Sequence, residues 1–141
     1  MRAALRVGEE LLLRRAFSQT DVRQFALLTG DLNPIHDGKS AAFPKAVVHG
    51  ALLASTFPAI FATHFPGAIY RSQTLTFRSA VPVDAAVLSR VSVDKVRQTR
   101  RGAFVECDTT LFLDDLERTV AVQGRATLWL PPETEDPAKD R

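Results

Sequence analysis

The apolar residues between positions 22 and 28 follow a mostly helical period. Ser18 and Asp21 are typical of a helix start, a hydroxyl cap followed by an acid three residues later. Val22, Phe25 and Ala26 then give one apolar face, and Gly30 stands where a left-handed residue ends a helix. We therefore expect a first helix between Ser18 and Thr29.

A second apolar segment, residues 47–63, is hydrophobic almost all round, which is typical of a helix buried on most sides. Pro58 lies inside it, so we expect the helix to kink or to lose its regularity there. Residues 31–46 join the two helices. They carry proline or glycine at positions 34, 38 and 44 and show no clear period, which predicts a structured loop.

The second half of the chain is rich in Val, Thr, Leu and Phe and alternates in part, as strands do. Turn-like joints separate its segments, so an antiparallel meander is the simplest arrangement. A further strand near residues 10–17 would make a sheet of about five. The four expected strands of the second half are 69–79, 85–98, 103–114 and 117–130.

These elements predict one α+β domain over residues 1–131, in which a bent antiparallel sheet of about five strands wraps around a long central helix. The last residues, 132–141, are rich in proline and charge, and we expect them to form a disordered tail.

Composition narrows the class of protein further. The 18 basic and 16 acidic residues are interspersed, which does not favour a nucleic-acid partner. No apolar stretch reaches the roughly 20 residues that span a membrane, so we expect no membrane partner either. The single cysteine, Cys107, excludes an internal disulfide and suits a reducing compartment. The three histidines show no close ligand spacing, and we therefore expect no metal site.

The candidate chemistry lies in two short segments. Gly30-Asp31-Leu32-Asn33-Pro34-Ile35-His36 places a carboxylate and an imidazole five residues apart on a turn, and Val48-His49-Gly50 opens the apolar helix. Free N–H groups at that helix start are suited to hold negative charge. Each residue taken alone has a plainer interpretation as a cap, a turn residue or a solvated histidine.

Taken together, the two segments and the later P-G-x-I-Y-x-S-Q-x-L-x-F pattern resemble the MaoC-like hydratases over residues 6–131. The resemblance implies the hot-dog fold. It also implies a hydro-lyase of fatty acid metabolism, which hydrates trans-2-enoyl thioesters or dehydrates (3R)-3-hydroxyacyl thioesters. The substrate would be an acyl-CoA or an acyl carrier protein thioester, and no cofactor is implied beyond the coenzyme A or phosphopantetheine of that substrate.

The resemblance also assigns site residues. Asp31 and His36 match the catalytic pair that activates water, and either of them is a candidate for the base. Asn33 matches the residue that shapes the loop, and Gly50 matches the backbone donor to the thioester carbonyl. With His49 they form the expected substrate-binding set, although His49 is also suited to hold the loop against the helix.

Three departures from the family pattern leave this pair in place. The loop between His36 and His49 is shorter than in typical members, so acyl preference is open. Pro58 stands where many relatives have a serine near the substrate, and Val83-Asp84-Ala85 replaces the usual V-G-D turn.

Two other functions remain open at this point: an acyl thioesterase of the same fold, and the active subunit of a hetero-oligomeric dehydratase.

We expect a homodimer, because pairing two sheet edges buries an exposed strand. A cytoplasmic location is our first expectation and the mitochondrial matrix our second. The candidates for contact with an anionic carrier are basic residues of the second half, namely Arg71, Arg78, Lys95, Arg97, Arg100 and Arg101.

Overall fold

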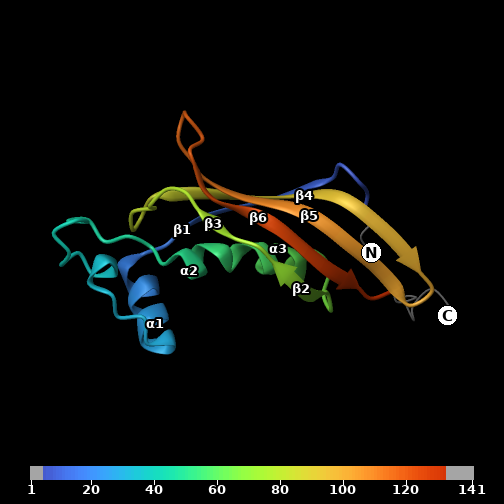
Figure 1. Cartoon of the computed structure of the whole chain (residues 1–141), viewed down its shortest axis with the longest axis horizontal. Helices are drawn as coiled ribbons and strands as arrows, with labels where there is room; N and C mark the ends of the chain where they lie inside the picture. Colours follow the sequence, from blue (N-terminus) through green and yellow to red (C-terminus); the bar gives the residue numbers. More distant parts are fainter. Residues whose placement is uncertain (1–4, 133–141) are drawn as a thin grey trace, which may run out of the picture.

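The computed structural model describes residues 5–132, and the expected tail lies outside this range except for its first residue. A long, bent sheet arches over two short helices that run end to end, while a third helix and its following loop lie at one end of the molecule (Figure 1). The elements in chain order are β1 (Glu10–Ala16), α1 (Gln19–Thr29), the 3-10 turn η1 (Pro34–His36), α2 (Gly50–Ala54), α3 (Thr56–His64), β2 (Ile69–Gln73), β3 (Thr76–Phe77), β4 (Ala86–Thr99), β5 (Gly102–Leu113) and β6 (Val120–Leu130).

The first helix, α1, begins and ends where the sequence predicts. The Asp21 N–H donates to Ser18 Oγ at 3.1 Å, and the Ser18 N–H donates to Asp21 Oδ2 at 2.9 Å, which completes a reciprocal cap. At the other end Gly30 has φ 82° and donates its N–H to the Ala26 carbonyl at 2.8 Å. Local side-chain chemistry thus determines where the loop after α1 begins.

The central helix differs from the prediction at its start. Residues 47 and 48 are extended: Val47 forms a bridge with Pro82, and the Val48 N–H donates to the Val81 carbonyl at 2.8 Å. The expectation that the Val48 N–H is a free donor at the helix start is therefore wrong. The helix begins at Gly50 instead.

The expected interruption near Pro58 is confirmed as a break at Ser55, between α2 and α3. Pro58 is the third residue of α3 and has no N–H to donate to the Ala54 carbonyl four residues earlier. The regular helix is therefore interrupted one residue after that carbonyl.

The sheet has six strands, in the order β1-β4-β5-β6-β2, with β3 also paired to β6. All of its pairings are antiparallel, and β4, β5 and β6 form the expected meander. Two details of the prediction are wrong. The expected strand over 69–79 is divided into β2 and β3, and β2 pairs with β6 rather than with the next long strand.

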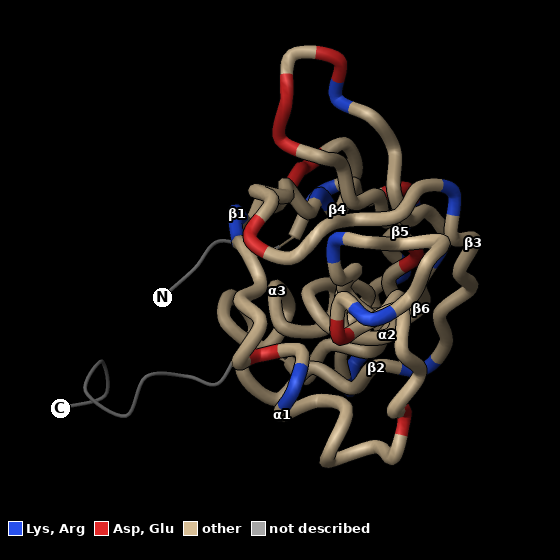
Figure 2. Tube along the Cα trace, turned by 90° about the vertical axis from the view of Figure 1, so that its left-hand side faces the viewer, with Lys and Arg blue, Asp and Glu red and all other residues tan. Residues whose placement is uncertain are grey.

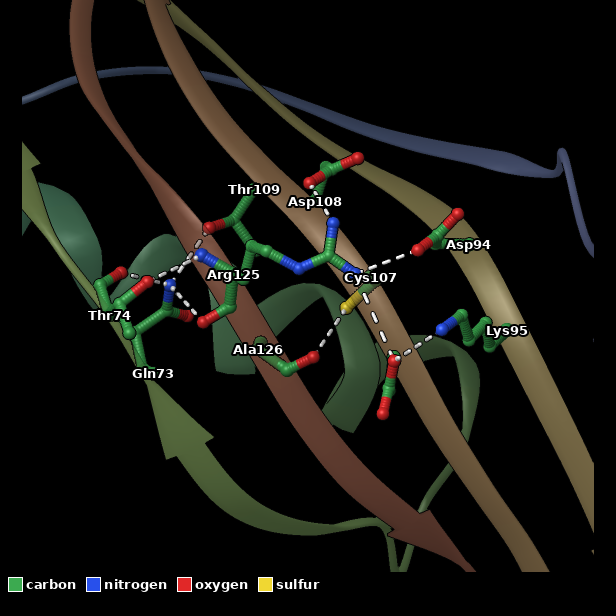
Figure 3. A network of polar contacts seen from close by, with 10 residues as sticks. Gln73, Thr74, Asp94, Lys95, Cys107, Asp108, Thr109, Arg125 and Ala126 are labelled. Carbon is green, nitrogen blue, oxygen red and sulfur yellow. Dashed lines mark hydrogen bonds and ion pairs between the residues drawn. The ribbon is translucent and has the colours of Figure 1, made fainter.

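The half-buried amide of Gln73 explains the division between β2 and β3 (Figure 3). The Gln73 amide accepts from the Tyr70 hydroxyl at 2.5 Å and donates to Thr109 Oγ1 and to the Thr74 carbonyl, each at 2.8 Å. Gly124 on β6 provides the room, because a β-carbon there would lie 1.7 Å from the Thr74 carbonyl oxygen. The chain therefore turns at Thr74 and returns to β6 as β3.

The core fills the space between the sheet and the central helices. Phe57 and Phe61 of α3 are at most 1% exposed, and Leu111 and Leu128 of the sheet are fully buried. Cys107 lies buried in β5, within the strand expected over 103–114, and burial raises the pKa of its thiol to about 12. This pKa keeps the thiol protonated at neutral pH.

Charged residues occur along the strands and the loops, with basic and acidic positions interspersed (Figure 2). Arg125 on the outer face donates to Asp94 at 2.7 Å and to Asp108 at 2.8 Å, which ties β4, β5 and β6 together (Figure 3). Among residues 5–132, no helix is long and apolar enough to cross a membrane.

Candidate active site

The loop that follows α1 is held by the side chains of its own residues. Asn33 Oδ1 accepts from the Ile35 N–H at 3.3 Å and so caps η1, and Pro34 starts this turn with its φ already fixed. The Asn33 N–H in turn lies 3.4 Å from Asp31 Oδ1. Asn33 therefore shapes the segment between the two candidate catalytic residues.

His36 is held on both its backbone and its ring. Its carbonyl accepts from Gln19 Nε2 of α1 at 3.0 Å, and its Nδ1 lies 2.7 Å from the Val47 carbonyl oxygen. A carbonyl oxygen only accepts hydrogen bonds, so Nδ1 carries the hydrogen. The neutral ring then has its lone pair on Nε2, the nitrogen that faces Asp31.

The Asp31 carboxylate and the His36 ring lie close together without a direct hydrogen bond. Asp31 Oδ2 is 3.9 Å from His36 Nε2; the Asp31 side chain is 50% exposed and the His36 side chain 10%. Both residues line a cavity of about 430 Å³ between α1 and the loop, together with Asn33, Arg23 and Lys39. Asp31 and His36 are thus both accessible from this cavity.

The two residues of the second segment, His49 and Gly50, lie against the first segment. His49 is 2% exposed, and its ring stacks on that of His36 with centroids 3.6 Å apart and planes 23° apart. Its Nε2 lies 3.2 Å from the Asp31 carbonyl oxygen. The structure therefore brings all five predicted site residues into one region, Gly50 as the direct neighbour of His49.

Gly50 is the first residue of α2, and no described residue accepts a hydrogen bond from its N–H. The Phe77 ring of β3 lies over it: a β-carbon at Gly50 would be 2.5 Å from Phe77 Cε1. Sequence reasoning missed Phe77 as a neighbour of the site. The only signal for it is the phenylalanine that closes the S-Q-x-L-x-F pattern.

The site also places three potential metal ligands together, which their spacing in the sequence did not indicate. One ligand atom from each of Asp31, His36 and His49 lies within 4.8 Å of the others. The two imidazole planes are nearly parallel, however, so their in-plane lone pairs run side by side instead of converging on one ion. The arrangement is better suited to acid and base chemistry than to a metal.

The six basic residues expected to meet a carrier are not gathered at this cavity. Arg71, Lys95 and Arg97 line a second cavity of about 820 Å³, where both arginines stack on Phe104. Arg100 and Arg101 lie at the β4–β5 turn, at the opposite end of the sheet from α1 (Figure 1). Their role in carrier binding stays a prediction.

Comparison with known proteins adds independent evidence. The model of the MaoC like domain family matches residues 4–112. The chain is 38% identical over 131 residues to the mitochondrial 3-hydroxyacyl-[acyl-carrier-protein] dehydratase of Arabidopsis thaliana. The aligned region covers 90% of this chain and 78% of that protein. It is 34% identical over 134 residues to the (R)-specific enoyl-CoA hydratase of Aeromonas caviae. That aligned region covers 91% of this chain and 97% of the hydratase.

Among solved structures, the (R)-hydratase from A. caviae involved in PHA biosynthesis is similar with a TM-score of 0.80 and 31% identity. The similarity covers 92% of this chain and all of that one. Sequence and fold therefore point to the same group of proteins.

Proposed function

The chain belongs to the MaoC-like family, and we propose that it is a hydro-lyase that adds water to trans-2-enoyl thioesters or removes it from (3R)-3-hydroxyacyl thioesters. Its family, the names of its relatives and its hot-dog fold all support this activity. The carrier is coenzyme A or an acyl carrier protein, since relatives of both kinds match nearly the whole chain.

The observation that carries the mechanism is the 3.9 Å gap between Asp31 Oδ2 and His36 Nε2. Both atoms accept hydrogen bonds, and a water molecule that lies about 2.8 Å from each fits between them. Its two hydrogens point to the two acceptors, which leaves an oxygen lone pair free to attack the β-carbon of an enoyl thioester. The pair therefore serves to bind and to activate the water.

The tautomer of His36 favours it as the base. His36 Nε2 takes one proton from the attacking water while the water oxygen bonds to the β-carbon, and the imidazolium then returns that proton to the α-carbon on the same face. Asp31 keeps the second hydrogen bond to the water and stabilises the positive charge on the ring. The ring ends in the protonation state in which it began.

Negative charge develops on the thioester oxygen as the β-carbon is attacked. The Gly50 N–H, which no described residue uses, is the candidate donor to that oxygen, and the start of α2 adds its aligned peptide dipoles. The absence of a side chain at Gly50 keeps the approach to this N–H short.

The test is the loss of enoyl thioester ultraviolet absorbance on mixing the protein with crotonyl-CoA, with longer enoyl-CoAs and with the corresponding acyl carrier protein thioesters. Chiral analysis of the product accompanies it. Formation of the (3R)-hydroxyacyl thioester is the expected result, and the preferred chain length and carrier follow from the rates. Release of free thiol without hydration would instead identify a thioesterase, and hydration only after a second chain is added would identify a subunit of a hetero-oligomer.

We also propose a homodimer. The edge formed by β2 and β3 is unpaired within residues 5–132 and exposes large apolar side chains, with Ile69 at 55% and Phe77 at 57%. Light scattering after gel filtration tests this.

Of the two expected locations, the mitochondrial matrix has support, because two relatives are named as mitochondrial.

A further inference from the structure

The ring of His49 is enclosed by the site it helps to form. It is 2% exposed, with His36 stacked on it at 3.6 Å and Phe25 of α1 tilted against it at 4.9 Å. Aromatic contacts thus come from α1 and from the loop. His49 is also the residue directly before α2, and its carbonyl accepts from the Leu53 N–H at 3.0 Å.

The hydrogen bonds of His49 determine its tautomer. Nε2 lies 3.2 Å from the Asp31 carbonyl oxygen, which only accepts, so Nε2 carries the hydrogen. The lone pair of the neutral ring is then on Nδ1, which is buried and has no hydrogen-bond partner among the described residues. A buried polar atom without a partner is destabilising and calls for an explanation.

We infer that His49 is a positioning residue, which acts through Asp31 and His36 and does not touch the substrate. Its N–H fixes the backbone of Asp31, its face fixes the ring of His36, and its own backbone leads into the Gly50 donor. One side chain thereby sets the relative placement of the base, the carboxylate and the oxyanion donor. This inference rests on the proposed function and deepens it.

Two variants separate the two contacts. His49→Gln keeps an N–H near the place of Nε2 but loses the aromatic face, whereas His49→Phe keeps the face and loses the donor. Small displacements of reacting groups have large effects on rate, so we expect each variant to lower kcat roughly tenfold or more while KM stays within about twofold. His49→Phe removes the unpartnered Nδ1 together with the hydrogen bond to the Asp31 carbonyl, two effects of opposite sign, so its thermal midpoint is expected to stay close to that of the parent.

The matched control is His64→Gln, at the last residue of α3, for which both kinetic constants are expected to stay unchanged. The inference is overturned if kcat in both His49 variants remains within twofold of the parent. It is equally overturned if KM rises while kcat is unchanged, because His49 would then bind substrate.

A spectroscopic readout tests the inference without any substrate. The chain has three histidines, so long-range ¹H–¹⁵N correlation spectra, assigned with the His49 and His64 variants, give the tautomer of each ring. We expect the hydrogen of His36 on Nδ1 and that of His49 on Nε2. A hydrogen on Nδ1 of His49 would remove its link to Asp31 and refute the positioning role, whatever the activity of the protein.

Discussion

Gly50→Ala in two backgrounds separates the chemical role of this glycine from its packing role. The new β-carbon would lie 2.5, 2.7 and 3.0 Å from three carbons of the Phe77 ring, whereas carbons in contact are about 3.5–4.0 Å apart. Within one chain Phe77 is 57% exposed, which leaves its ring room to shift, although the proposed dimer would cover it. The cost of the clash is therefore at the lower end for overpacking, about 1 kcal/mol.

The backbone preference of alanine is expected to stabilise the fold and so to offset the clash with Phe77. Gly50 is the first residue of α2, and its φ lies outside the left-handed range, so alanine fits the backbone. Alanine is favoured over glycine in a helix by up to about 1 kcal/mol. In the parent, Gly50→Ala is then expected to change the free energy of unfolding little, whereas in a Phe77→Ala background it is expected to stabilise by up to about 1 kcal/mol.

The assay is urea denaturation of the four chains of this double-mutant cycle, beside the rate of enoyl thioester hydration for each. Gly50→Ala is expected to reduce the hydration rate by about a hundredfold in both backgrounds, because the methyl group crowds the N–H that the thioester oxygen must reach. If activity returns to that of Phe77→Ala in the double variant, Gly50 is needed only to accommodate Phe77, and the proposed oxyanion donor is refuted.

Three further predictions concern the loop and the sheet. Asn33→Ala removes the cap of η1 and is expected to lower stability by about 1 kcal/mol in urea titrations, while Asn33→Asp keeps the cap and most of that stability. Gly124→Ala places a β-carbon 1.7 Å from the Thr74 carbonyl oxygen, so a large fall in the thermal midpoint is expected; an unchanged midpoint would contradict the close contact between Thr74 and β6. Burial raises the pKa of Cys107 from 9.0 to about 12, so the folded state binds a proton that the unfolded state loses over this range. The free energy of unfolding of the parent is therefore expected to fall between pH 9 and pH 12. That of the Cys107→Ala variant should fall less steeply, and denaturant titrations of both proteins across this range measure the difference.

Local features of the fold were predictable from the sequence because neighbouring residues determine them. The cap formed by Ser18 and Asp21 and the left-handed Gly30 define α1, and the Asn33-Pro34 turn follows directly. The helix start near residue 47 was misplaced because the extended conformation of Val47 and Val48 depends on Val81 and Pro82, more than thirty positions away.

The pairing of β2 with β6 has the same long-range origin. It depends on the Gln73 amide reaching Thr109 and on Gly124 leaving room for the Thr74 carbonyl, which no local pattern encodes. At the site, the resemblance named Asp31 and His36 correctly as neighbours. The stacking of His49 on His36 and the position of Phe77 over Gly50 arise from tertiary packing, so sequence spacing did not indicate them.

Asp31→Asn tests whether Asp31 and His36 activate water together. The Asp31 side chain is half exposed, and an asparagine still accepts the Asn33 N–H, so the fold and the thermal midpoint are expected to stay unchanged. Asp115→Asn, at the tip of the β5–β6 hairpin, is the matched control for loss of one carboxylate.

The measurement is single-turnover hydration of crotonyl-CoA, or of the carrier protein thioester if that is the better substrate, by the parent and both variants. We expect the hydration rate to fall about a hundredfold or more for Asp31→Asn and to stay unchanged for Asp115→Asn. An Asp31→Asn variant that is folded and hydrates substrate within a fewfold of the parent rate would contradict this expectation.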